Sequence, residues 1–216
     1  MRLLDALHSI AAIDAPSLQT RDVAVTLGVS PAYASTVLAR LAAARHLVRV
    51  RRGVWVFPDR VDPLALPECL TFPFPAYVSL QSALYLHGMI SQIPAVTYAV
   101  SLARTRRFVT ALGTVSVHHL EPRFFFGFED AGRPGGRLAT PEKALVDFLY
   151  LAPARSRLFR ALPELDLPRT FSARLARSIV RRIEPPRRRT RVSRALERLL
   201  ESRADAVAMH QPRRTG

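Results

Sequence analysis

The sequence has little cysteine and lysine and lacks asparagine altogether. Cys69 is its only cysteine and Lys143 its only lysine among 216 residues. A single cysteine excludes an internal disulfide framework and a cysteine-based zinc site, and it suits a reducing compartment. We interpret Cys69 as a small, partly buried thiol. The shortage of lysine and asparagine, beside abundant Ala, Pro and Leu, is typical of a GC-rich genome, so the preference for arginine says little about function.

Long apolar runs are also missing. No stretch approaches the roughly 18 apolar residues that a membrane-spanning helix needs. The N-terminal segment MRLLDALHSI contains an acid and a histidine where a signal peptide needs unbroken apolar residues. The sequence therefore predicts a cytoplasmic protein with no membrane partner. It also lacks a glycine-rich phosphate loop, a nucleophile elbow and a Cys/His pair, so we expect neither an enzyme nor a bound cofactor.

Positive charge dominates what is present. The chain has 32 basic and 17 acidic residues, a formal net charge of +15 and a sequence pI near 11.5. A protein this basic is expected to bind an anionic polymer or surface, and nucleic acid is the first candidate. With 49% hydrophobic residues, the chain can bury a real core. Its length allows one large domain or two small ones.

Two short helices are predicted at the start of the chain. The first is indicated by apolar residues that recur at helical spacing, and it ends before Pro16, where residues 14–17 break the pattern. The second follows Thr20, a possible N-cap, and stops at Gly28, whose tolerance of positive φ suits a helix C-terminus. The apolar stripe of the first helix is Leu3, Leu4, Leu7, Ile10 and Ala11.

A third helix and a hairpin complete this pattern. Ser30 and Pro31 begin the helix as N-cap and first helical residue, positions that suit these residue types. The segment LVRVRRGVWVF, residues 47–57, then alternates apolar residues with arginines around Arg52-Gly53, as a two-stranded hairpin would. This order predicts a winged helix-turn-helix DNA-binding domain over residues 1–57, the alternative being a purely structural three-helix bundle. The predicted buried stripe of the third helix is Ala34, Val37, Leu38 and Leu41.

Candidate DNA contacts lie on the outer face of the third helix and on the hairpin. Recognition helices enter the major groove N-terminus first, so Tyr33, Ser35 and Thr36 are expected near bases or phosphates. Arg40 is expected on the DNA backbone, and Tyr33 packed under the hairpin is the alternative for that residue. The hairpin arginines are placed to follow phosphates or the minor groove, unless the hairpin is merely solvated. The full predicted set is Ser30, Ala32, Tyr33, Ser35, Thr36, Arg40, Arg49, Arg51 and Arg52.

Beyond the hairpin the sequence predicts a connector and a second domain. Five prolines punctuate residues 58–76 without a sustained period, which indicates an ordered or semi-rigid connector at a domain boundary. Residues 77–216 mix helical and strand patterns. The predicted fold class is therefore α+β, with an N-terminal winged helix-turn-helix domain followed by a mixed α/β C-terminal domain with a helical, arginine-rich end.

Local patterns outline this second domain. A helix capped by Ser79, a hairpin turning near Gly113 and a helix opened by Thr140 are expected. Further helical stretches are expected near residues 172–182 and 191–208. The last 62 residues, from 155 on, hold 17 arginines and six acids. They extend a DNA contact, neutralise an acidic partner protein or form a solvated face, and charge alone does not decide between these roles.

Two groups of polar residues have the residue types of a catalytic or metal centre. Neither group has the spacing or the predicted location that such a centre requires. His118 and His119 lack a third ligand at metal spacing, and as neighbours on a strand they point to opposite faces, so one is expected exposed and the other packed. Glu142, Lys143 and Asp147 resemble the parts of a nuclease centre but lie on a predicted helix. Glu142 there complements the helix dipole more simply. No catalytic residue and no metal ligand is predicted.

Five features follow one another along about residues 20–152: the predicted N-terminal winged helix closing in RRGVWVFP, then YVSLQSALYLHGMISQIP, RRFVTALGTVSVHHL, FFFGF and ATPEKALVDFLYL, the last being the most specific. In this order they resemble the AbiEi family of antitoxins, which are partners of AbiEii nucleotidyltransferase toxins in bacterial toxin–antitoxin operons. The resemblance implies an N-terminal domain that represses its own operon at inverted repeats, with several copies on the DNA. It also implies a C-terminal domain that counteracts a cognate toxin, directly or indirectly, in a setting of phage defence.

Two other functions fit the same sequence. One is a stand-alone winged-helix transcription factor whose C-terminal domain senses a small ligand. The other is a nuclease with a winged-helix targeting domain, which would need Glu142 or Asp147 at a metal-dependent centre. The antitoxin that binds its own promoter DNA is the function that the sequence favours.

Overall fold

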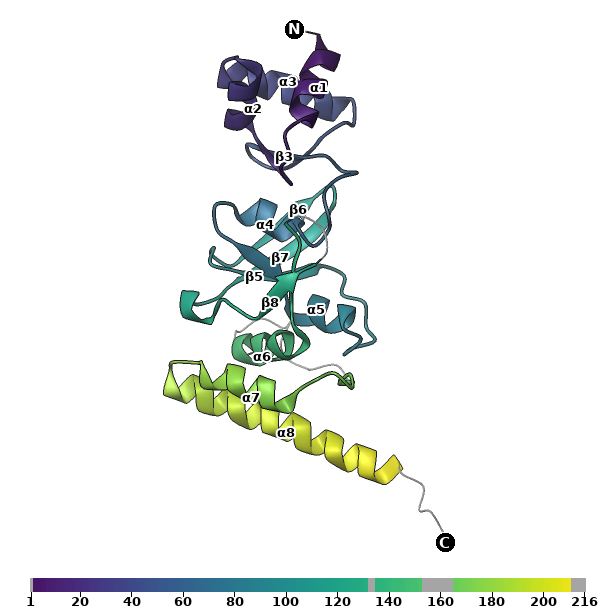
Figure 1. The fold of residues 1–216 in the computed structure, drawn as a ribbon, viewed down its shortest axis with the longest axis vertical. Coiled ribbons are helices and arrows are strands. Elements are labelled where there is room, and N and C mark those ends of the chain that lie inside the picture. The colour runs from purple at the N-terminus through teal and green to yellow at the C-terminus, as the bar shows by residue number, and fades with distance from the viewer. Residues whose placement is uncertain (1, 132–134, 153–164, 211–216) are drawn as a thin grey trace. The chain divides into compact units, whose positions relative to one another are not determined.

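The chain folds as α+β, as the sequence predicts. The computed structural model describes the backbone of residues 2–131, 135–152 and 165–210, and these residues form helices and two β-sheets (Figure 1). They divide into two compact units, each described here by itself. The first unit takes residues 1–78 and 95–138, and the second takes residues 79–94 and 139–216.

Three packed helices begin the first unit. α1 spans Leu3–Ala11, α2 spans Thr20–Leu27 and α3 spans Pro31–Ala43. Their apolar faces meet in one core, which contains all four residues predicted for the buried stripe of α3. Leu4, one of the apolar residues at helical spacing in α1, does not join this core. Leu4 is 74% exposed, because α1 packs through the face that carries Ile10.

Local caps fix the turn between α2 and α3. Gly28 ends α2 in the left-handed conformation, with φ of 63°, which a residue without a Cβ adopts at no steric cost. The Ser30 hydroxyl accepts a hydrogen bond from the backbone N–H of Tyr33 at 3.3 Å, and Pro31 follows at the first helical position. Both predicted caps are confirmed. A bend of 104° separates the axes of the two helices.

A three-stranded antiparallel sheet follows the helices. β2 (Val48–Arg51) and β3 (Val54–Val56) form the predicted hairpin. β1 (Leu18–Gln19), which the sequence analysis missed, pairs with the other edge of β3. β3 is therefore a central strand, and its three residues are all buried instead of alternating. The prediction that Thr20 caps α2 is wrong, because its hydroxyl accepts a hydrogen bond from Trp55 Nε1 at 3.1 Å and makes no side-chain cap.

The hairpin shares a second core with the rest of the first unit. Helix α4 (Leu66–Thr71) lies inside residues 58–76, where only a connector was expected. Pro67 in the first turn of this six-residue helix, together with its short length, leaves no sustained apolar period for sequence reasoning to detect. The buried residues of this core are Val50, Val54, Val56, Leu66, Cys69, Leu70, Ala99, Val115 and Val117.

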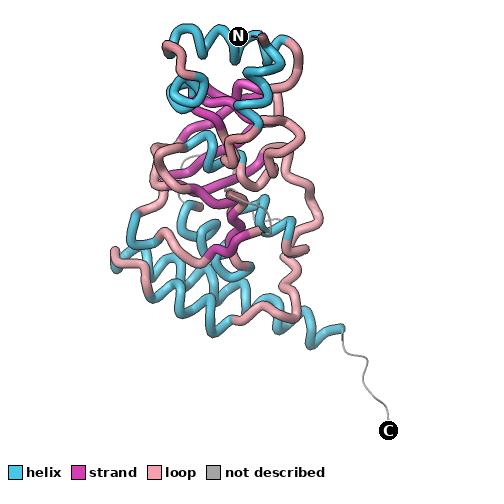
Figure 2. Tube along the Cα trace, turned by 45° about the horizontal axis from the view of Figure 1, so that its top comes forward, coloured by secondary structure: helices cyan, strands magenta, loops and turns pink. Residues whose placement is uncertain are grey.

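A six-stranded mixed sheet completes the first unit. Its order is β6-β7-β5-β4-β9-β8, and its strands are magenta in Figure 2, as are those of the smaller sheet. β6 and β7 form the predicted hairpin, which turns just before Gly113, and β6 is an edge strand. A short 3-10 helix, Pro122–Phe124, follows β7. The strands are β4 (Ala76–Val78), β5 (Thr97–Ser101), β6 (Arg106–Thr110), β7 (Gly113–His119), β8 (Phe128–Asp130) and β9 (Arg137–Ala139).

The described part of the second unit is helical. Its helices are α5 (Leu80–Leu86), α6 (Pro141–Leu151), α7 (Ala173–Arg181) and α8 (Pro186–His210). α7 and α8 lie side by side (Figure 1). α8 begins before the predicted residue 191, because Pro186 is accepted in a first helical turn and the arginines after it favour a helix. The parts of the predicted arginine-rich end at residues 155–164 and 211–216 lie outside the described residues.

Helix α6 holds a buried polar network. The predicted Thr140 cap is confirmed, since its hydroxyl accepts a hydrogen bond from the Lys143 backbone N–H at 3.3 Å. The Lys143 ammonium pairs with Asp147 at 2.5 Å, and both side chains are completely buried. Ser79 makes no side-chain cap on α5, contrary to the prediction, because its hydroxyl donates to Asp147 Oδ2 at 2.8 Å. Glu142 accepts a hydrogen bond from the backbone N–H of Ser172 at 2.7 Å, so it joins two helices as well as lying in a first turn.

Candidate nucleic-acid interface

The outer face of α3 is open to solvent. The residues predicted there lie opposite the buried stripe and are all exposed. Tyr33 is 44% exposed, so it is not packed under the hairpin, which was the alternative for this residue. Thr36 turns its hydroxyl back to the Ala32 carbonyl at 3.2 Å. The exposed set is Ala32, Tyr33, Ser35, Thr36 and Arg40, and we call it the outer face of α3.

Ser30 differs from the rest of the predicted helix set. Its hydroxyl is the N-cap acceptor for the backbone N–H of Tyr33. The cap occupies the side-chain oxygen and holds the first turn of α3 in place, which orders the end of the helix where Tyr33 lies. Ser30 therefore stabilises the first turn of α3, at the edge of the outer face.

The three hairpin arginines are held in three different ways. Arg49 is exposed and lies over the ring of Trp55, with its guanidinium carbon 5.5 Å from the ring centroid. Arg52 is exposed at the turn. Arg51 donates from its two terminal nitrogens to the carbonyls of Leu70 and Phe72, at 3.0 and 2.8 Å. Arg51 thus ties the hairpin to α4, whereas Arg49 and Arg52 face solvent.

Sequence reasoning missed a cavity of about 390 Å³ where the hairpin meets edge strand β6. We call it the arginine pocket. Arg106 stacks over Phe108, with its guanidinium carbon 5.0 Å from the ring centroid, and Arg107 is exposed beside it. The three arginines of RTRRF, residues 104–108, indicate a basic site in the sequence, but the strand pattern used to predict this hairpin depends on its apolar residues alone. The pocket is lined by Val50, Arg51, Arg52, Arg106, Arg107, Phe108 and Val109.

The charged side chains that line the arginine pocket are all positive. None of its lining residues is acidic. In the part of the chain that the structure describes, no carboxylate forms an ion pair with Arg52, Arg106 or Arg107. Arg51 Nε is buried without a hydrogen-bond partner, which leaves one donor of this residue unsatisfied. A cavity with this lining is suited to an anion.

The two histidines of β7 point to opposite faces, as predicted. His118 is buried and His119 is exposed. The Ser116 hydroxyl lies 3.1 Å from His118 Nε2, and burial lowers the pKa of His118 below its ordinary value. Burial also raises the pKa of Tyr98, against the opposing charge of Arg107. His118 and Tyr98 are therefore buried side chains, whereas His119 faces solvent.

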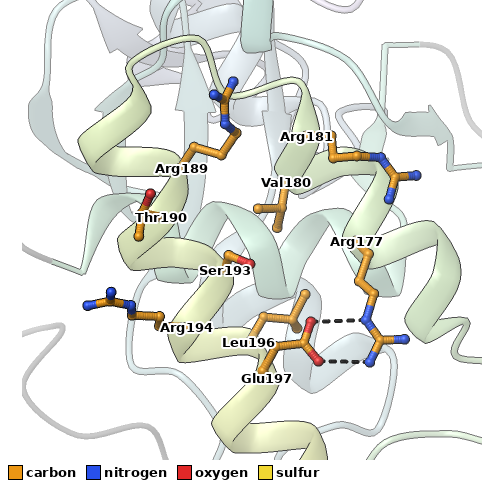
Figure 3. A pocket seen from close by; sticks show the side chains of 9 residues that line it. All are labelled: Arg177, Val180, Arg181, Arg189, Thr190, Ser193, Arg194, Leu196 and Glu197. Atoms are coloured by element: carbon orange, nitrogen blue, oxygen red, sulfur yellow. Dashed lines mark hydrogen bonds and ion pairs between the residues drawn. The ribbon is translucent and has the colours of Figure 1, made fainter.

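A second basic surface lies on the second unit, in a groove between α7 and α8 (Figure 3). We call it the basic groove, and its cavity is about 380 Å³. Arg177 forms two hydrogen bonds with the Glu197 carboxylate, at 2.9 and 2.8 Å, and this pairing raises the pKa of Arg177 and lowers that of Glu197. Val180 and Leu196 are buried in its floor. The groove is lined by Arg177, Val180, Arg181, Arg189, Thr190, Ser193, Arg194, Leu196 and Glu197.

The residues with the side-chain types of a catalytic or metal centre are buried inside the protein. Glu142, Lys143 and Asp147 are buried, and each is bonded to a neighbouring group. Among the described residues, no three His, Cys, Asp or Glu side chains are grouped as metal ligands. Cys69 is buried, and burial raises the pKa of its thiol to about 11, which keeps it protonated and unreactive near neutral pH.

Fold and surface together define a basic α+β protein with an exposed helix and an arginine-lined cavity in one unit. No protein-family model matches the chain, and no curated protein matches its sequence significantly. Within the described ranges, no single helix has the length and apolar character needed to cross a membrane.

Proposed function

We propose that this protein binds double-stranded DNA through a winged helix-turn-helix formed by α1–α3 and the β2–β3 hairpin, and that it represses its own operon as an antitoxin. The exposed outer face of α3 is the observation that carries the proposal. The DNA would be its own promoter, at inverted repeats that accept several copies of the protein.

The geometry of α2 and α3 supports a helix-turn-helix. In such motifs two helices meet at roughly 90–120° across a turn of about three or four residues that often contains glycine. The bend of 104° and the turn from Gly28 to Ser30 fall within this description. The second helix of the motif is the one that enters the major groove, and here that helix is α3.

The outer face of α3 suits the major groove. With 13 residues, the helix is on the order of 20 Å long, and the groove of B-DNA is about 12 Å wide. Ala32, Ser35 and Thr36 are small, so the helix axis is able to approach the base edges closely. Tyr33 and Arg40 reach further and are placed to contact bases or phosphates.

The hairpin supplies positive charge beside this helix. Arg49 and Arg52 are exposed on it and are the side chains that would follow the phosphate backbone. Arg51 would act differently from the prediction made for it, because its terminal nitrogens already bind carbonyls of the first unit. We assign Arg51 the role of holding the hairpin in position.

The antitoxin part of the proposal rests on the resemblance to AbiEi proteins and on the second unit. A cognate AbiEii-like nucleotidyltransferase toxin would be the protein partner. The basic groove offers Arg181, Arg189 and Arg194 to an acidic surface of such a partner. Glu142, Lys143 and Asp147 are buried and bonded to neighbouring groups, which favours a regulator over a nuclease that would use Glu142 or Asp147. Such a regulator would act in the cytoplasm and would need no cofactor.

The experiment is a fluorescence anisotropy titration at several salt concentrations, comparing the chain's own upstream DNA with a scrambled duplex of equal length. We expect a preference of about 10³ or more for the upstream DNA, the lower end of specific recognition. Equal affinity for both duplexes at physiological salt would overturn the proposal.

A matched pair of threonines tests the role of α3. Thr36 on α3 and Thr26 on α2 are both exposed, and each hydroxyl donates to the carbonyl four residues earlier. Thr36→Ala is expected to reduce the preference for the upstream DNA about tenfold, whereas Thr26→Ala leaves it unchanged. Equal effects of the two changes would contradict base contacts by α3.

A further inference from the structure

The arginine pocket joins two predicted DNA-contact residues, Arg51 and Arg52, to residues of β6 that the sequence analysis did not assign. Strand β6 provides one wall, with Arg106, Arg107 and Phe108, and the hairpin provides the other. β6 is the edge strand of the larger sheet. Positive charge from two separate parts of the sequence, more than 50 residues apart, therefore converges on one cavity.

Phosphate is the ligand chemistry that this cavity fits. Arginine binds phosphate oxygens through paired N–H donors and keeps its charge at every physiological pH. Arg52, Arg106 and Arg107 have no carboxylate partner in the described part of the chain. Guanidinium groups gathered without counter-charge repel one another, and an anion bound between them would remove this repulsion.

The walls of the pocket are already held in place. Arg106 rests on the Phe108 ring, which restricts the motion of its guanidinium group. The two hydrogen bonds from Arg51 to the carbonyls of Leu70 and Phe72 fix the hairpin wall. A preformed site loses less conformational entropy when its ligand binds.

We propose that the arginine pocket binds a phosphate of the DNA backbone, so that strand β6 extends the phosphate contacts of the hairpin. This inference rests on the proposed function. Arg52 connects the two surfaces, because it stands at the hairpin turn and also lines the pocket. A duplex whose backbone follows the hairpin past Arg52 would place its next phosphate between Arg106 and Arg107.

The test compares the wild-type protein with Arg106→Gln/Arg107→Gln in the same anisotropy titration. Each phosphate contact contributes about 0.9 to the slope of log K against log salt. We expect the double variant to lower this slope by about 1 and to weaken binding of upstream and scrambled duplex about equally, with the preference between them retained. Arg106→Lys/Arg107→Lys keeps the charge and is expected to retain the wild-type slope.

The control variant is Arg187→Gln/Arg191→Gln, which removes two exposed arginines from α8 in the second unit. If it lowers the slope as much as the pocket variant, the effect is one of net charge and the inference is overturned. If the pocket variant binds like the wild type while the wild type prefers upstream DNA, the inference fails and the proposed function stands. If the wild type itself shows no preference, the proposed function fails, and absence of DNA binding overturns both.

A further experiment tests whether the arginine pocket binds free phosphate instead of a phosphate of DNA. Inorganic phosphate is titrated against the wild type and the pocket variant, with thermal unfolding as the readout and sodium chloride as the ionic-strength control. No phosphate-specific shift is expected in the millimolar range. A shift that the pocket variant loses, together with unchanged DNA binding, would show a site for free phosphate and would overturn the inference.

Discussion

The Lys143 ammonium and the Asp147 carboxylate form an ion pair that is completely buried, one helical turn apart on α6. It uses the only lysine of a chain that otherwise takes arginine at every basic position. Burial lowers the pKa of Lys143, and the Asp147 charge opposes that effect. Asp147 also accepts the hydroxyl of Ser79, so α5 and α6 are joined through one carboxylate.

Removing one partner of this pair should destabilise the protein strongly. Lys143→Met leaves the Asp147 carboxylate buried without its cation, which costs about 3–5 kcal/mol in comparable cases. The double variant Lys143→Met/Asp147→Leu is expected to recover part of that loss, because the buried carboxylate is removed together with the ammonium. Urea unfolding measures both. A double variant no more stable than Lys143→Met would contradict this account.

Loss of the α3 cap should lower stability by a smaller amount. Ser30→Ala removes the acceptor for the Tyr33 N–H, and a lost N-cap costs about 1 kcal/mol. Ser35→Ala, an exposed serine on the same helix with no cap role, is the control and should stay within about 0.5 kcal/mol of the wild type. Chemical denaturation distinguishes the two changes.

Substitution of Arg51 should lower stability, whereas substitution of Arg52 should weaken DNA binding. Arg51→Met removes two charge-assisted hydrogen bonds to carbonyls and is expected to cost about 2 kcal/mol of unfolding free energy. Arg52→Met should change stability by less than about 0.5 kcal/mol and weaken binding to every duplex. Unfolding and anisotropy measurements on both variants check this. If Arg51→Met leaves stability unchanged, the carbonyl contacts do not hold the hairpin.

His118 should make the first unit less stable in mild acid. Its pKa is lowered in the folded protein by burial, so the unfolded chain takes up a proton first as the pH falls through about 6.5. Stability attributable to His118 is therefore complete above that pH and declines below it, by at most about 1.4 kcal/mol per pH unit. His118→Gln should reduce this pH dependence, measured by denaturation between pH 7.5 and 5. An identical pH dependence in the variant would refute the assignment.

Predictions from the sequence succeeded where the determining forces are local. The buried stripe of α3 follows from a 3.6-residue period, and the roles of Gly28, Ser30 and Thr140 follow from capping chemistry within a few residues. The alternation that predicted the β2–β3 hairpin is also a short-range signal. Because these elements carry the candidate DNA contacts, most of that surface was predictable.

The failures concern partners far apart in the chain. The Ser79 hydroxyl bonds to Asp147, 68 residues later, and makes no cap hydrogen bond to α5. The acceptors of Arg51 lie 19 and 21 residues beyond it. The arginine pocket needs Arg52 and Arg106 brought together by sheet packing. Local propensity contains no information about such pairs, so residue types alone assigned Arg51 to DNA and left Arg106 unassigned.

The position of Trp55 gives the protein a spectroscopic reporter. It is the only tryptophan in the chain, and it lies on β3, bonded to Thr20 and beneath the Arg49 guanidinium. Its emission spectrum therefore arises from one known environment at the base of the hairpin. A duplex that draws Arg49 from the indole ring would change that emission, so unlabelled protein is able to report the arrival of DNA in real time.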